Sequence, residues 1–168
     1  MLLHVEHLAE HFGKASGRSL QDADSGSPAR PVSVNIVYTG PQTTLPALRA
    51  ADSLARDLSA TVHIRAMISV PRQLAMEVAL SSIQFLKRLI GDLVERVGSE
   101  RREYVLHIYL CRSRIETLLQ VLEPSSLLVI GGRRRIWPTA ESRLSKAAAS
   151  AGHSVAFVAA KISLAGIR

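Results

Sequence analysis

The sequence has few of the residues that cross-link a chain or carry it through a membrane. A single cysteine, Cys111, excludes an internal disulfide framework and fits the reducing cytoplasm. The longest apolar runs are too short to cross a bilayer. The opening "MLLHVEHLAEHF" lacks the basic start and the apolar core of a secretory signal. We therefore expect a cytoplasmic protein without a membrane partner.

Aromatic side chains are also scarce, at 4% of 168 residues, which leaves no obvious surface for stacking nucleic-acid bases. The formal net charge is nevertheless +7. Residues 32–168 carry 18 basic and ten acidic side chains, or +8, whereas residues 1–31 carry three and four, or −1. Because this charge is dispersed and no recognition helix is visible, nucleic-acid binding ranks last among the functions considered.

The chain divides into an N-terminal extension, one folded domain and a short tail. Within the extension, residues 1–31, the pattern predicts a short amphipathic helix over 1–13. Residues 14–31 are small, polar and rich in turn formers, which predicts a disordered linker. Residues 32–160 are long enough for one domain with a sizeable core, and 161–168 form the C-terminal tail.

From residue 32 onward, predicted strands and helices alternate. The strands are expected at 32–38, 61–67, 103–110, 126–130 and 154–158. The helices are expected at 44–58, 73–97, 113–122 and 139–151. Thr44, Ser113 and Thr139 are the expected N-caps. Such alternation predicts a parallel sheet with helices on both faces, a three-layer α/β/α sandwich.

No arrangement of reactive residues in the sequence predicts an enzyme. His4, His7 and His11 would share one face of the first helix, but no carboxylate or cysteine cluster completes a metal site. Arg112 lies next to Cys111 and would lower its pKa, yet no resolving cysteine exists. Ser–His–Asp arrangements and paired carboxylates are missing. We therefore expect neither catalysis nor a bound metal.

Two stretches of the folded part resemble the universal stress protein family. They are "NIVYTGPQTTLPALRAADSLARDLSATVHI" and "SSLLVIGG…ESRLSKAAASAGHSVAFV", and the resemblance extends over residues 32–158. It implies a Rossmann-like fold of the adenine nucleotide alpha hydrolase type, with five parallel strands in the order 3-2-1-4-5. It also implies a ligand site at the carboxyl ends of the first and fourth strands, where ligands bind in open α/β sheets.

In nucleotide-binding members of that family, an acidic residue ends the first strand. It aligns here with Thr39, which is followed by the expected Gly40. A carboxylate can accept two hydrogen bonds from the ribose hydroxyls, and the threonine hydroxyl cannot replace it in this role. The end of the first strand therefore has the glycine expected at a nucleotide site, Gly40, but lacks the acidic residue.

The family's phosphate loop, G-x2-G-x9-G-[ST], is also altered. Its first glycine is Gly131, its second aligns with Arg134 and its third with Glu141, while Ser142 keeps the hydroxyl. The loop is three residues shorter than the family pattern. Glycines let backbone N–H groups approach phosphate, and Glu141 adds a negative charge where the phosphate would lie. Family-type ATP binding is therefore expected to be weakened or lost, with no cofactor.

Two functional hypotheses remain open. The first is a non-catalytic regulatory or stress-response module with a degenerate loop. The second is a small-molecule sensor in which Arg133–Arg135 bind an anion through their side chains, although these arginines also suit a solvated basic turn. The candidate ligand-binding residues are Thr39, Gly40, Arg112, Gly131, Gly132, Arg133, Arg134 and Ser142.

Other residues favour packing or association. Trp137 either covers a ligand or packs on the sheet, and packing is the favoured interpretation. His63 and His107 fall within strands and are predicted core residues. The last strand, Ser154–Val158, is apolar and would be a liability as an open edge. We therefore expect a homodimer formed through this strand, with the 73–97 helix as an alternative contact surface.

Overall fold

The computed structural model describes residues 10–12, 33–75, 80–98, 104–133 and 138–160. Five parallel strands form the centre of the molecule: β2 Ser33–Val37, β3 Thr61–Ser69, β4 Tyr104–Cys111, β5 Leu127–Gly132 and β6 Ser154–Ala159. Their order across the sheet, β4-β3-β2-β5-β6, is the predicted 3-2-1-4-5 order. The parallel sheet and its strand order are therefore confirmed.

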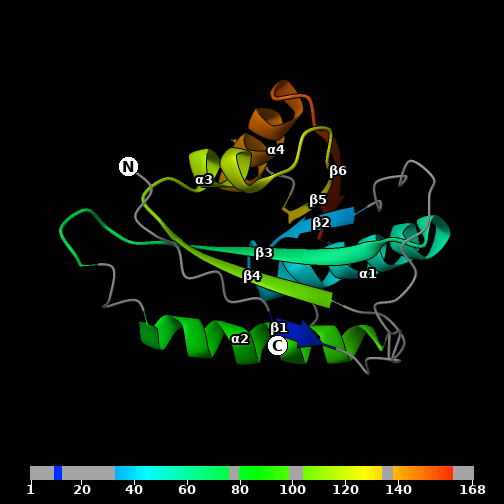
Figure 1. The fold of residues 1–168 in the computed structure, drawn as a ribbon, viewed down its shortest axis with the longest axis horizontal. Coiled ribbons are helices and arrows are strands. Elements are labelled where there is room, and N and C mark those ends of the chain that lie inside the picture. The colour runs from blue at the N-terminus through cyan, green and yellow to red at the C-terminus, as the bar shows by residue number, and fades with distance from the viewer. Residues whose placement is uncertain (1–9, 13–32, 76–79, 99–103, 134–137, 161–168) are drawn as a thin grey trace, which may run out of the picture.

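Helices cover both faces of the sheet, as predicted (Figure 1). The helices are α1 Pro41–Leu58 and α2 Leu80–Val97 on one face, and α3 Arg114–Val121 and α4 Ala140–Ser150 on the other. Each face has its own apolar core, and β2 contributes buried side chains to both, for example Ile36 to one and Val37 to the other. In the described ranges no helix combines the length and the apolar composition that a membrane span needs.

A sixth strand, β1 (Glu10–Phe12), pairs antiparallel with β4 and places His11 opposite Val105. The helix predicted over residues 1–13 is therefore wrong at these three positions. Pairing with β4 satisfies backbone groups along an edge that would otherwise stay open, and this outweighs a weak helical pattern. His11 therefore lies on a strand, whereas His4, His7 and the predicted linker, residues 14–31, fall outside the described residues.

Helix α1 begins at Pro41, three residues before the predicted start. Gly40, with φ +134°, is its N-cap in place of Thr44. Thr44 is instead buried, and its Oγ1 accepts a hydrogen bond from Thr39 N at 3.1 Å. Proline suits the first helical position because its fixed φ is already helical and its missing N–H would have no partner there. The predicted caps Ser113 and Thr139 are confirmed.

Residues 71–75, which follow β3, are not helical. Residues 71–75 form a turn, so the helix predicted over 73–97 is wrong at its start, while 76–79 lie outside the described residues. The guanidinium of Arg112, just after β4, donates to the backbone carbonyls of Val70, Pro71 and Leu74. These bonds hold the carbonyls in a turn, which a local helical pattern cannot reveal.

A buried carboxylate joins α1 to the sheet. Asp52 is 5% exposed; its Oδ2 lies 3.0 Å from Arg56 Nη2, and its Oδ1 accepts a hydrogen bond from the Tyr104 hydroxyl at 3.0 Å. Tyr104 is completely buried at the start of β4. A buried carboxylate is stable only when hydrogen-bonded or paired, so this contact fixes α1 over β4.

Replacing Tyr104 with phenylalanine removes this donor from a buried acceptor. We expect Tyr104→Phe to lower the free energy of unfolding by about 1–3 kcal/mol, measured by urea denaturation. Tyr38→Phe is the matched control, because the Tyr38 hydroxyl has no hydrogen bond within the described part of the chain. Equal losses for the two variants would contradict a specific role for the Asp52 contact.

Candidate functional site

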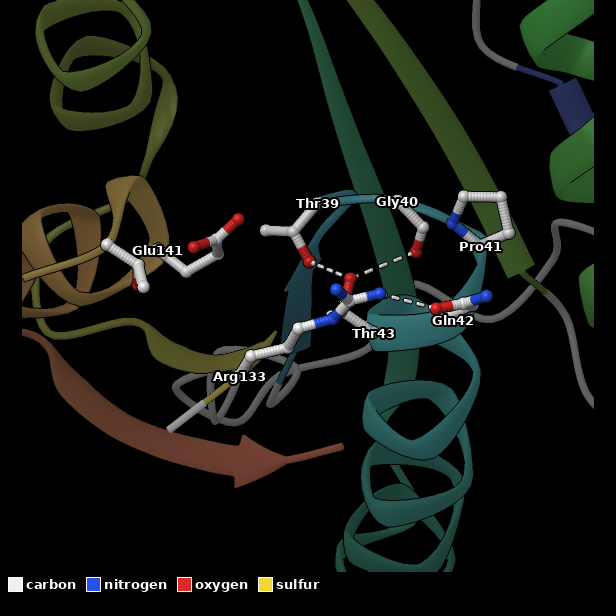
Figure 2. A pocket seen from close by; sticks show the side chains of 8 residues that line it. Thr39, Gly40, Pro41, Gln42, Thr43, Arg133 and Glu141 are labelled. Carbon is white, nitrogen blue, oxygen red and sulfur yellow. Dashed lines mark hydrogen bonds between the residues drawn. The ribbon is translucent and has the colours of Figure 1, made fainter. Parts of the chain in front are cut away.

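The two central strands define where a ligand site can form. β2 leads into α1 on one face of the sheet, and its neighbour β5 leads toward α4 on the other. Chain connections therefore diverge at the carboxyl ends of this pair and leave a crevice between them. A cavity of about 610 Å³ opens there (Figure 2). Its lining residues are Thr39, Gly40, Pro41, Gln42, Thr43, Arg133, Thr139 and Glu141.

Thr39 connects the two strands across the floor of this cavity. Its hydroxyl donates to the Gly131 carbonyl at 2.7 Å and lies 2.9 Å from the Thr43 hydroxyl. Thr43 Oγ1 is also 3.1 Å from the Gly40 carbonyl. Because each hydroxyl has one proton, Thr43 donates either to Thr39 or to Gly40. The residue aligned with the family's acid is therefore engaged in structural hydrogen bonds.

Position 131 requires glycine because a side chain there would collide with α1. A Cβ at this position would lie 1.8 Å from the Thr43 carbonyl oxygen and 2.6 Å from its carbon. Gly131 has no positive φ, so its conformation is open to other residues and only the close approach demands glycine. The sequence suggested a phosphate-loop glycine, and the structure gives it a packing role between β5 and the first turn of α1.

Arg133 forms the positive side of the cavity. Its Nη2 donates to Gln42 Oε1 at 2.5 Å, which holds the guanidinium beside the start of α1 (Figure 2). The first turn of α1 contains no acidic residue, and the N-cap Gly40 makes no side-chain hydrogen bond to it. A helix N-terminus that has neither an acidic side chain nor a side-chain cap favours an anion. Arg133 and the start of α1 therefore both favour anion binding in this cavity.

Glu141 lies on another wall, in the first turn of α4. Thr139 caps that helix by accepting a hydrogen bond from the Ser142 N–H at 3.2 Å. Glu141 lines the cavity and extends its carboxylate toward Thr39 (Figure 2). Within the described residues it forms no hydrogen bond or ion pair. The cavity therefore carries one described cation and one described carboxylate.

The predicted site residues are only partly brought together. Thr39, Gly40 and Arg133 line the cavity, and Gly131 forms the strand end beside it. The remaining candidates do not line it or cannot be placed. Arg112 donates hydrogen bonds to carbonyls after β3, and Gly132 packs against Phe157. The backbone N–H of Ser142 takes part in the α4 cap. Arg134, Arg135 and Trp137 lie outside the described residues.

Sequence reasoning missed the first turn of α1. Pro41, Gln42 and Thr43 line the cavity, but the predicted helix began after them. The dipeptide Gly40–Pro41 was the available signal, because glycine tolerates the positive φ of this N-cap and proline favours the first helical position. Thr139 was recognised as a cap but not as a lining residue.

Other candidate reactive groups have structural partners. His63 Nδ1 lies 2.9 Å from His107 Nε2; His107 is buried as predicted, whereas His63 is only partly buried. Burial raises the pKa of the Cys111 thiol, while a hydrogen bond with Thr117 and the nearby charge of Arg114 oppose this shift. The lower pKa considered for Cys111 is therefore wrong. No group of three or more metal-ligating side chains occurs among the residues the structure describes.

The fold and the crevice define a doubly wound α/β domain with a cavity at its strand-order switch. Solved structures with this architecture include three universal stress proteins, each 16% identical to the chain. One from Archaeoglobus fulgidus gives a TM-score of 0.56 over 76% of this chain and 93% of its own. One from Burkholderia pseudomallei gives 0.55 over 79% and 98%.

The third is a universal stress protein from Archaeoglobus fulgidus in complex with dAMP, with a TM-score of 0.54 over 76% of this chain and 97% of its own. No protein-family model and no curated protein sequence matches the chain. The chain therefore has the universal stress protein fold, as the resemblance implied.

The two adjacent glycines at the end of β5 should differ in their tolerance of a side chain. Gly131→Ala places Cβ against the backbone of Thr43, whereas Gly132→Ala meets the Phe157 ring tip at 2.5 Å and Glu141 Cβ at 3.0 Å. We expect Gly131→Ala to lose about 3 kcal/mol of unfolding free energy or more, and Gly132→Ala about 1–2 kcal/mol, because a ring moves more easily than a helix backbone. Chemical denaturation measures both; the reverse order would contradict the packing role.

Proposed function

We propose that this protein is a non-catalytic regulatory module that binds a small phosphorylated ligand in the cavity between α1 and α4. The observation that carries the proposal is the convergence of Arg133 and the acid-free N-terminus of α1 on one side of that cavity. A guanidinium binds phosphate oxygens by charge-assisted hydrogen bonds, and a helix N-terminus adds favourable N–H groups. The dAMP complex of a protein with this fold supports the choice of a nucleotide as probe.

The same cavity offers little for catalysis. Among its described lining residues, only Arg133 and Glu141 are charged. Arginine stays protonated and cannot act as a base, and Glu141 has no hydrogen-bond or ion-pair partner among the described residues. The hydroxyls of Thr39 and Thr43 are engaged with each other and with backbone carbonyls. A nucleophile with an adjacent base, the usual requirement for group transfer, is not assembled by the described residues.

The binding mode would differ from that of a glycine-rich loop. In such a loop, backbone N–H groups surround the phosphates. In this chain Gly131 is packed against α1, and Arg133 supplies a side-chain donor instead. The expected site therefore holds a phosphate by one guanidinium and one helix end, which predicts weaker binding of a triphosphate than the glycine loop provides.

Calorimetric titration with AMP in metal-free buffer tests the proposal. We expect Arg133→Met to weaken binding by about tenfold or more, because a charged hydrogen bond contributes about 1.5–3 kcal/mol and 1.4 kcal/mol is tenfold in affinity. Arg143→Met is the matched control, since Arg143 is exposed on α4 and does not line the cavity. No binding at millimolar AMP, or equal losses in both variants, would contradict the proposal.

We also propose that the module forms a homodimer through β6. This strand is one of the two edges of the described sheet, and the other edge is β1. Ser154 and Ala160 donate their N–H groups to Ser126 and Gly132 on the β5 side. Because donors alternate along a parallel strand, Val155 directs its N–H to the open edge, where a second β6 can pair with it.

Val155→Pro removes one outward donor and should leave the ladder to β5 intact. We expect this variant to be monomeric at concentrations where the wild type and the control Val155→Thr are dimeric, measured by sedimentation equilibrium. A dimer that persists in Val155→Pro would contradict pairing through β6. It would favour the α2 surface instead, where Phe85 is 69% exposed.

A further inference from the structure

The cavity is electrically asymmetric. Arg133 reaches from the end of β5 to the first turn of α1, whereas Glu141 enters from the first turn of α4 (Figure 2). The groups between them are neutral: the hydroxyls of Thr39 and Thr43 and the backbone of Gly40. A ligand that fills the cavity must therefore match a cation on one side and a carboxylate on the other.

Two helices begin at this cavity, and the described residues in their first turns differ in charge. The first turn of α1 has no acidic residue, so its partial positive charge is available. The first turn of α4 contains Glu141, whose carboxylate offsets the partial charge of that helix end. Among the described lining residues, positive charge therefore lies on the Arg133 side and negative charge on the Glu141 side.

We infer that Glu141 makes the cavity selective for a single phosphate carried on a neutral, hydroxylated body, and excludes polyphosphates. This inference rests on the proposed function of the cavity. A second or third phosphate adds negative charge in a partly enclosed space beside the Glu141 carboxylate, which has no cation partner among the described residues, and like charges at short range repel strongly there. Neutral hydroxyl groups instead donate hydrogen bonds to the carboxylate.

The size and lining of the cavity support this ligand class. A volume of about 610 Å³ is much more than one phosphate occupies and falls within the range of small-molecule sites. Its neutral walls carry hydroxyl and carbonyl oxygens that can accept further hydrogen bonds, which suits polyhydroxylated molecules. A nucleoside monophosphate and a sugar phosphate share this chemistry, so AMP and ribose 5-phosphate serve as the two probes that distinguish them.

The test is a phosphate series of AMP, ADP and ATP, titrated by calorimetry in low-salt buffer with EDTA. For the wild type we expect affinity to fall from AMP to ATP by about tenfold or more, and the difference to shrink as salt screens the charges. Glu141→Gln should remove most of this difference, mainly by strengthening ATP binding, whereas Glu141→Asp should retain it. Ribose 5-phosphate binding close to that of AMP would place recognition in the sugar phosphate.

Glu116→Gln is the matched control, because Glu116 is an exposed acid in the first turn of α3 and does not line the cavity. Circular dichroism verifies that each variant is folded. Equal affinity of the wild type for AMP and ATP, or an equal change for all three nucleotides in Glu141→Gln, would overturn the role of Glu141. Those outcomes leave binding through Arg133 in place, whereas no AMP binding at all would remove both proposals.

Discussion

The Thr43 carbonyl occupies the space where a side chain at position 131 would begin, and this contact sets the spacing between β5 and α1. A larger residue would push the helix from the strand and open the crevice. Thr39 strengthens the same junction, since its hydroxyl bonds to Gly131 and contacts Thr43. The cavity therefore has a rigid floor, and its shape depends on a close backbone contact between two elements far apart in the sequence.

The charged groups around this cavity differ from those of a phosphate site lined by glycines. Gly131 is used for packing, so the attractive groups are the side chain of Arg133 and the open end of α1. Glu141 occupies the corresponding end of α4. Side chains, rather than a backbone loop, thus determine the electrostatics, and single substitutions can change which ligands fit.

The alternation of strands and helices was predictable because it depends on local hydrophobic period and on local caps such as Ser113 and Thr139. Features that depend on distant partners were not. Strand β1 has only three residues, too few to show the alternation of apolar and polar side chains that predicts a strand. The turn after β3 depends on hydrogen bonds from Arg112, which is distant in the sequence. Thr39, Gly40 and Arg133 were predicted as one group and do line one cavity, but the packing role of Gly131 required knowing where Thr43 lies.

The antiparallel strand β1 has a consequence for assembly. It pairs with Tyr104–Leu106 of β4, so the described sheet ends in the three-residue β1 on one side and in the six-residue β6 on the other. A sheet with two open boundaries can add copies at both ends and grow into a fibre, because each added copy exposes a new edge. An edge strand as short as β1 offers few backbone groups for pairing, so that side of the sheet is a poorer template for an added copy than β6.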